Sequence, residues 1–117
     1  MQVTTATSEA LTKYLDLTAD QMKLTAANMA NIDTPGYKTQ GIDFDSEFTQ
    51  ALKGTAGSAP KVTDVDGLVA RADGNTVSLD RESLNLAKAQ LQFRTGVELL
   101  KHQYSEMMSA IHALSSP

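Results

Sequence analysis

Apolar residues recur along the last third of the chain in alternating steps of four and three. That spacing is typical of a heptad repeat, in which one stripe of a helix packs against a partner helix, and it predicts a helix over residues 81–114. We expect Asp80 to be the N-cap of this helix and Glu82 to lie in its first turn. Leu79 and Leu84 have the spacing of a hydrophobic staple around that cap. The stripe consists of Leu86, Gln90, Phe93, Val97, Leu100, Tyr104, Met107, Ile111 and Leu114.

The front of the chain carries a second apolar pattern, built from spacings of four and seven, which predicts an amphipathic helix over residues 8–31. Thr18 and Thr25 occupy intervening positions, where a β-branched polar residue weakens an isolated helix but permits the close approach of a neighbour. We therefore expect this helix to pack against another. Its stripe consists of Leu11, Leu15, Met22, Met29 and Ile32, widened by Leu17 and Leu24.

The first helix ends in the segment NMANIDTPGYK. We expect Asn31 to close the helix in the left-handed conformation, while the following proline moves Thr34 out of the helical region. Pro35 and Gly36 suit the two central positions of a type II turn. Asn28 and Asn31 lie three residues apart on one face, where their amides can bond across to another backbone. A simple helix stop with a solvated polar face is the alternative interpretation.

The residues between the two helices are smaller and more polar. The segment KGTAGSAPK, residues 53–61, predicts a mobile loop, and Asp-Gly-Asn at 73–75 predicts a small β-hairpin. The predicted fold class is mainly α, with two long terminal helices forming a coiled-coil hairpin and an irregular middle segment that carries the β-hairpin. We divide the chain into an N-terminal helix and turn (1–38), the loop and hairpin (39–78) and a C-terminal helix (79–117), the first and last sharing one core.

The predicted C-terminal helix is too long for a compact globule. Its roughly 34 residues, at ~1.5 Å each, would span about 50 Å. A compact chain of this size has a diameter of about 35 Å. Both apolar patterns are also broader than a two-stranded seam needs, and the surplus includes Leu17, Leu24, Leu99 and Met108. This surplus predicts self-association or a bundle with partner helices.

The composition argues against several other classes of protein. Aromatic residues make up only 5% of the 117 residues and Trp is absent, which suits seams of Leu, Met, Ala and Val better than a compact core. A net charge of -4 and the absence of a Lys/Arg cluster argue against a nucleic-acid partner. Without cysteine the chain has neither disulfides nor thiol catalysis. The start, MQVTTATSEA, lacks the pattern of a cleavable signal peptide, and we expect no membrane span.

Catalytic and metal chemistry find little support in the sequence. His102 and His112 are ten residues apart, off a common face of the predicted helix, and no third ligand completes a metal site. The DVDG segment at residues 64–67 lacks the glycine position and the closing Glu of a calcium loop. No Ser, His and Asp combination lies in a nucleophile context. We therefore expect no enzyme activity, no cofactor and no metal.

Two motifs resemble a known family. The segment AANMANIDTPGYK is similar to the signature of bacterial flagellar axial proteins, Ala-x-Asn-Ile-Ala-Asn-x-x-Thr-Pro-Gly-Tyr, with Met29 in place of the usual Ile. DGNTVSLDRE resembles the segment that leads into the C-terminal helix of proximal rod proteins of the flagellar basal body. With IDF at residues 42–44, these resemblances span both ends and cover most of the chain. The stretch from Gln50 to Val69 is shorter than the insertion many family members carry.

The resemblance implies a structural subunit of the basal-body rod. Such a subunit is exported by the flagellar type III apparatus without a cleaved signal and polymerises in the periplasm through its terminal helices. The implied partners are further copies of the chain, other rod proteins, the basal adaptor FliE, the membrane (MS) ring and the export apparatus. Another rod or hook axial subunit, or a soluble helical adaptor that binds a client helix, remain the alternatives.

The residues expected at the assembly interface come from both helices and from the turn after the first. The apolar stripes would be buried within one subunit and between subunits, and the turn would fix where the first helix stops. The expected set is Leu11, Leu15, Met22, Met29, Asn28, Asn31, Thr34, Pro35, Gly36, Tyr37, Leu86, Phe93, Val97, Leu100, Tyr104, Met107, Ile111 and Leu114.

Overall fold

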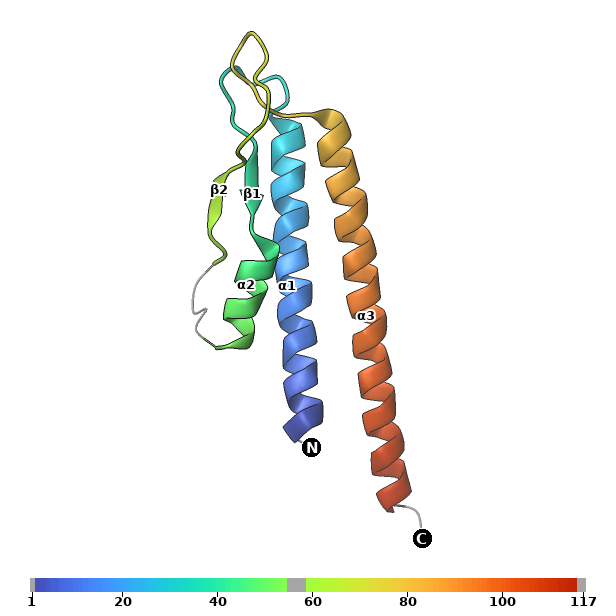
Figure 1. Ribbon diagram of the computed structural model, residues 1–117. Helices are drawn as coiled ribbons and strands as arrows, with labels where there is room; N and C mark the ends of the chain where they lie inside the picture. Colours follow the sequence, from blue (N-terminus) through green and yellow to red (C-terminus); the bar gives the residue numbers. More distant parts are fainter. Residues whose placement is uncertain (1, 55–58, 116–117) are drawn as a thin grey trace.

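Two long helices run side by side in opposite directions through the molecule (Figure 1). The structure is a computed structural model that describes residues 2–54 and 59–115. The helices are α1 (Gln2–Ala30) and α3 (Leu79–Ser115). Between them in sequence come β1 (Gln40–Ile42), α2 (Phe44–Leu52) and β2 (Val62–Asp64). The mainly α class with a small two-stranded sheet in the middle is confirmed.

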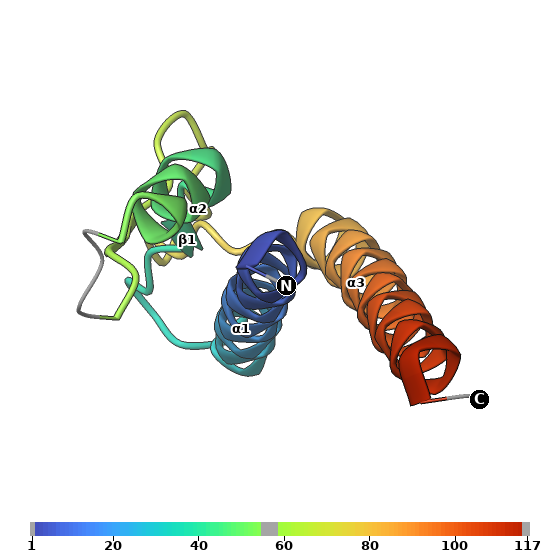
Figure 2. The same cartoon turned by 90° about the horizontal axis from the view of Figure 1, so that it is seen from below.

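The elements form three layers. Seen end on, α1 lies between α3 on one side and α2 with the strands on the other (Figure 2). The Cα radius of gyration is 18.7 Å and the molecule measures 73 × 27 × 17 Å. A compact chain of this length has a radius of gyration near ~13 Å. The elongated shape arises because α3 continues past the N-terminal end of α1 (Figure 1).

The most buried positions of the contact between α1 and α3 carry small or polar side chains. The fully buried positions of α3 are Glu82, Ala89 and Gly96, which recur every seven residues. On α1, Thr18 and Thr25 are buried, as the close approach expected at these positions requires. A Cβ at Gly96 would lie only 2.8 Å from Leu15 Cδ2, so the two helices leave no room for a larger residue there. The predicted apolar stripe of α3 therefore lies beside this contact line and is not centred on it.

Both long helices begin earlier than predicted. α1 starts at Gln2, six residues before the expected start. At α3 the cap is Ser78, because its carbonyl accepts from Glu82 N (2.9 Å) and its hydroxyl accepts from Arg81 N (3.3 Å). The prediction of Asp80 as N-cap is wrong, and Leu84 is too exposed to form the staple. Ser78, itself a favoured capping residue, directly follows the buried Val77, and this fixes the earlier start.

The small sheet does not lie where the sequence placed it. β1 and β2 pair antiparallel with Gly41 opposite Thr63, whereas residues 73–75 form a turn without strands. The chain does reverse there, since Gly74 N donates to Arg71 O (2.9 Å). The residues on either side of this turn do not pair as strands, because those after Gly74 bond to the segment that follows α1. The predicted position of the β-hairpin is therefore wrong. The predicted loop at 53–61 falls partly outside the described residues.

The short helix α2 was not predicted. It packs on α1 through three rings: the centroids of Phe44 and Phe48 lie 5.4 and 5.6 Å from that of Tyr14, with edge-to-face geometry. Asp43 caps its N-terminus through Ser46 N, and Lys13 Nζ donates to Ala51 O (2.8 Å) at its C-terminal end.

The packing of α2 on α1 also covers part of the apolar surface that the sequence analysis counted as surplus. Leu17 lies beside α2 residues and is only 6% exposed. Its predicted place in the surplus is wrong, whereas Leu99 and Met108 are about half exposed, at 51% and 53%. No helix among the described residues combines the length and the apolar character needed to cross a bilayer.

Candidate functional site

The asparagine at the end of α1 is the centre of a buried hydrogen-bond cluster. Asn28 is 1% exposed, and its side-chain oxygen accepts from Gln40 N and from the Tyr37 hydroxyl, both at 3.0 Å. Its amide nitrogen donates to Gln40 O (2.9 Å) and to Glu82 Oε2 (3.3 Å). The amide thus pairs with β1 from the side opposite β2, much as a neighbouring strand would. Every donor and acceptor of this side chain is satisfied inside the subunit.

The carboxylate in this cluster belongs to the first turn of α3. Glu82 is 1% exposed, and its other oxygen, Oε1, pairs with Arg81 Nη1 at 3.0 Å. A buried carboxylate needs such partners, and the positive end of the helix dipole adds to them. Glu82 therefore links the beginning of α3 to the end of α1, which the sequence analysis did not foresee.

A second buried asparagine closes the end of α1. Asn75 is 0% exposed, and its amide nitrogen lies 2.8–3.1 Å from the carbonyls of Asn31, Ile32 and Thr34. Its oxygen accepts from Val77 N at 2.7 Å. These carbonyls belong to the turn that follows α1, so Asn75 fixes the path of the chain directly after the helix. The sequence analysis placed Asn75 only in a turn; its place in DGNTVSLDRE was the one signal that pointed to it.

The turn after α1 has the predicted geometry at its tip. Tyr37 N donates to Thr34 O (3.2 Å) and Gly36 has φ 73°, as a type II turn with Pro35 and Gly36 at its centre requires. The left-handed conformation predicted for Asn31 is wrong, because no described residue other than glycine has positive φ. Asn31 N instead lies 3.2 Å from both Ala27 O and Asn28 O.

Residues just after the turn bind the segment that leads into α3. Gly36 N donates to Asp73 O (2.8 Å), Thr76 N to Tyr37 O (3.1 Å), and Thr39 N to the Thr76 hydroxyl (2.9 Å). Together with the bonds of Asn28, Asn75 and Glu82, these contacts define what we term the joint: Asn28, Tyr37, Gln40, Asn75 and Glu82. The joint holds the end of α1 and the start of α3 together at one end of the molecule.

The expected interface residues thus fall into separate groups. Asn28 and Tyr37 belong to the joint, and Asn31, Thr34, Pro35 and Gly36 make the turn beside it. The apolar members are half-buried on α1 and along most of α3, but exposed at the end of α3: Tyr104 is 53%, Ile111 45% and Leu114 87% exposed. The half-buried members are Leu11, Leu15, Met22, Met29, Leu86, Phe93, Val97, Leu100 and Met107.

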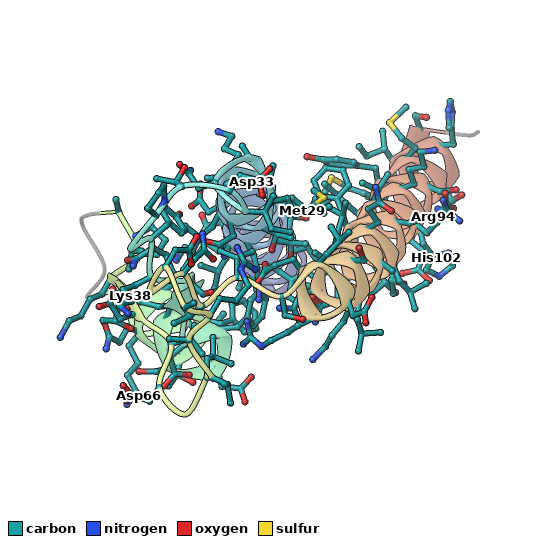
Figure 3. The ribbon with its side chains drawn as sticks, turned by 90° about the horizontal axis from the view of Figure 1, so that it is seen from above. Met29, Asp33, Lys38, Asp66, Arg94 and His102 are labelled. Atoms are coloured by element: carbon teal, nitrogen blue, oxygen red, sulfur yellow. The ribbon has the colours of Figure 1, made fainter. Side chains whose placement is uncertain are left out.

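An open groove runs between α1 and α3 on one side of the pair. It has a volume of about 420 Å³ and is lined by Met22, Phe93 and Val97, with Gln90 and Arg94 at α3. Figure 3 shows Met29 in the same angle between the two helices, and His102 on the side of α3 that faces away from α1. We term this apolar side, with its continuation to Tyr104 and Ile111, the open face.

Ionisable groups do not gather into a metal centre in the described ranges, where no three His, Asp or Glu side chains lie close enough to share an ion. His102 Nε2 lies 3.0 Å from Glu106 Oε1 one turn along α3, and both side chains are exposed.

Comparison with known proteins shows the class of protein that this sequence resembles. Residues 15–38, which include the end of α1 and the turn, match the family model described as flagella basal body rod protein. The chain is 33% identical to the flagellar basal body rod protein FlgB of Salmonella typhimurium over 119 residues, covering 83% of this chain and 86% of the relative. It is 31% identical to FlgB of Escherichia coli over 121 residues, covering 85% and 88%.

Each of these two relatives covers more than four-fifths of the chain, so the class is that of the flagellar basal-body rod proteins. Within that class, the chain belongs to the FlgB family. It is a structural subunit of the flagellar basal-body rod, and its family assembles with other rod proteins. The resemblance of the two motifs to flagellar rod proteins is thereby confirmed.

Proposed function

We propose that the chain is exported by the flagellar type III apparatus without a cleaved signal peptide and polymerises through its terminal helices into the proximal part of the rod, in the periplasm. The role is structural and involves no catalysis and no cofactor. The proposed neighbours are further copies of the chain, other rod proteins, the adaptor FliE and the MS ring. The FlgB relatives support this proposal at the level of the rod.

The exposed apolar side chains near the C-terminal end of α3 are the observation that supports polymerisation. Tyr104, Met108 and Ile111 are each about half exposed, on a part of α3 that extends to the free end of the molecule (Figure 1). Contiguous exposed apolar surface marks a site of protein contact. Burying it against neighbouring helices would release about 25 cal/mol for each Å² removed from water. An isolated copy cannot bury it within the described fold.

The interface that we propose is narrower than the set expected from the sequence. It consists of the open face and of Leu114 near the end of α3, and its residues are Met22, Met29, Phe93, Val97, Tyr104, Ile111 and Leu114. The joint has its polar groups satisfied internally, so its role in assembly is indirect: it sets where α1 stops and how α3 starts. Leu11, Leu15, Leu86, Leu100 and Met107 would serve mainly the contact inside the subunit.

A charged residue on the open face should block assembly without reducing export. In cells that lack their own copy of this subunit, Ile111→Asp is expected to abolish swimming and rod formation while the amount of exported subunit stays near the wild-type amount. The reason is that a carboxylate at a half-exposed apolar contact must be desolvated when copies associate. Leu100 is less suitable, because it is half-buried in the free subunit and its replacement would also disturb the fold.

Ser109→Asp is the matched control, since it adds the same charge to an exposed position of the same turn and on another face. Cells carrying Ser109→Asp should swim normally. Normal rods in cells carrying Ile111→Asp would contradict the proposed interface.

A further inference from the structure

Methionine is the only sulfur-containing residue type of this chain, and its side chains differ in exposure. The sequence has five methionines and no cysteine. Apart from Met1, the methionines lie on the two long helices, at Met22, Met29, Met107 and Met108. Three of these four are half-buried, whereas Met108 is 53% exposed. The thioether of Met108 is therefore the most accessible sulfur in the part of the chain that the structure describes.

Met108 stands among residues of the proposed interface. It follows Tyr104 by four positions and precedes Ile111 by three, and residues with these spacings share one face of a helix. Both of these residues are also about half exposed, at 53% and 45%. Met107 is turned about 100° away around the helix and is half-buried. A chemical change at Met108 therefore alters the surface through which copies are proposed to associate.

We propose that Met108 is a reversible oxidation site that controls the assembly of the free subunit, with peroxides as the class of oxidant. The inference rests on the proposed polymerisation. A thioether is apolar and flexible, whereas its sulfoxide is polar and chiral, and this change disrupts apolar contacts. A copy oxidised at Met108 must desolvate the sulfoxide oxygen in order to associate. Oxidised copies therefore stay out of the rod.

The oxidation step requires only the thioether and the peroxide. A lone pair of the sulfur attacks one peroxide oxygen, the O–O bond breaks and an S–O bond forms. The departing hydroxide takes the proton of the transferred oxygen and leaves as water, so the sulfur loses two electrons and the peroxide gains them. Methionine sulfoxide reductases reverse the change. In the reverse step a thiol donor supplies two electrons and becomes a disulfide, and the oxygen leaves as water.

Assembly protects the same sulfur. In the proposed rod, neighbouring subunits cover the face formed by Tyr104, Met108 and Ile111, so peroxide does not reach the thioether. Peroxide thus stops the addition of new copies and leaves the subunits of finished rods unmodified.

Hydrogen peroxide is the probe for the free subunit. The purified chain is treated until Met108 has gained one oxygen, which tandem mass spectrometry locates, and its association is then measured by sedimentation velocity. Oxidation should raise the concentration needed for association roughly tenfold, the effect of a polar group left unpartnered at an apolar contact. Treatment with a thiol and both methionine sulfoxide reductases, one for each epimer, should restore association.

The outcomes of this experiment separate the inference from the proposed function. An oxidised chain that associates as readily as the untreated chain would overturn the inference and leave the proposed function intact. A loss of association that the reductases do not repair would also overturn the inference, because the damage would not be a sulfoxide. An untreated chain that does not associate at any concentration would overturn both.

Met108→Leu and Met107→Leu are the matched pair of variants. Leucine is apolar and close to methionine in volume. Each variant is compared with itself before and after peroxide, so an effect of the substitution alone does not enter the comparison. Met108→Leu should resist peroxide, whereas Met107→Leu, which keeps the exposed sulfur, should remain sensitive. Equal sensitivity of the two variants would show that the assignment to Met108 is wrong.

A thioether placed outside the open face provides a second control. Leu84 is 71% exposed and stands two residues after the buried Glu82, about 200° around the helix from the contact with α1. In the chain that carries Met108→Leu, the further change Leu84→Met restores an exposed sulfur at this other site. Peroxide should oxidise that sulfur without impairing association. Loss of association would show that oxidation acts wherever it occurs and not through the proposed interface.

Isolated basal bodies test the protection of assembled subunits. Basal bodies and the free subunit are treated with the same amount of hydrogen peroxide, and the sulfoxide content at Met108 is followed over time by mass spectrometry. Met108 should be oxidised several-fold more slowly in the basal bodies. Equal rates would contradict the burial of this residue between subunits.

Discussion

Replacing Asn28 by alanine is expected to lower the free energy of unfolding by roughly 3 kcal/mol, because a buried polar group that loses its partner costs about 1–3 kcal/mol. The substitution leaves Gln40 N, Gln40 O and Glu82 Oε2 each without one partner. The loss should appear in urea denaturation followed by circular dichroism. Swimming should also decline, since the end of α1 and the start of α3 are no longer held together.

Asn31→Ala is the matched control for this prediction. Asn31 is the same residue type three positions along, is only half-buried, and bonds mainly to its own turn through Ala27 O and the Thr34 hydroxyl. Its replacement should cost less than about 1 kcal/mol, which is the size of one local hydrogen bond. Equal losses of unfolding free energy for the two variants would show that the buried bonds of Asn28 stabilise the fold no more than a local hydrogen bond does.

Gly96→Leu is expected to destabilise the pairing of α1 and α3 by about 2 kcal/mol. Leucine is a better helix former than glycine by nearly 1 kcal/mol, so the helix by itself would gain. The added Cβ, however, would lie 2.8 Å from Leu15 Cδ2 and 3.2 Å from Tyr14 Cδ1. Overpacking of this kind typically costs 1–3 kcal/mol, and the rest of the leucine side chain adds to it. Urea denaturation followed by circular dichroism measures the balance.

A second substitution distinguishes steric overlap from other causes. Adding Leu15→Ala to Gly96→Leu makes room at the contact and should recover part of the lost stability. Gly96→Ala should have a small net effect, because its methyl group overlaps mainly the movable end of Leu15, and the Tyr14 ring at 3.2 Å has to move only slightly. A gain in stability for Gly96→Leu would contradict the close approach of α1 and α3 at this residue.

The long helices and the turn were accessible to sequence reasoning because their signals are local. The heptad spacing predicts α3 from its own residues, and a Pro-Gly pair defines a type II turn without reference to the rest of the chain. The burial of Thr18 and Thr25 also followed from their place between the apolar residues. Helix starts were less predictable, since Ser78 and Asp80 are both good caps and only the burial of Val77 decides between them.

The joint could not be predicted from the sequence because its hydrogen-bonding residues are far from one another along the chain. Asn28 bonds to Glu82, 54 positions away, and Asn75 closes a helix that ends more than 40 positions earlier. An isolated Asn or Glu is compatible with a surface position, and the sequence pattern contains nothing that pairs them. The same reason explains the misplaced hairpin: residues after Gly74 bond to the segment after α1, and β1 finds its strand partner at residues 62–64.

The signature of the family thereby acquires a structural meaning in this chain. Its asparagine, threonine, proline, glycine and tyrosine build a helix end with internal partners, and the exposed apolar surface lies elsewhere, on the open face and along α3. The polar groups of the joint are thus satisfied within the subunit, whereas the apolar side chains near the C-terminal end of α3 are exposed. Assembly through that end is the central claim.

Sedimentation velocity of the purified chain, combined with circular dichroism over a wide range of concentration, tests this claim most directly. We expect the mean mass and the helicity to rise together with concentration, and Ile111→Asp to abolish the rise while Ser109→Asp preserves it. A chain that stays monomeric and fully helical at every concentration would show that one copy satisfies its own terminal helices, which would contradict the account.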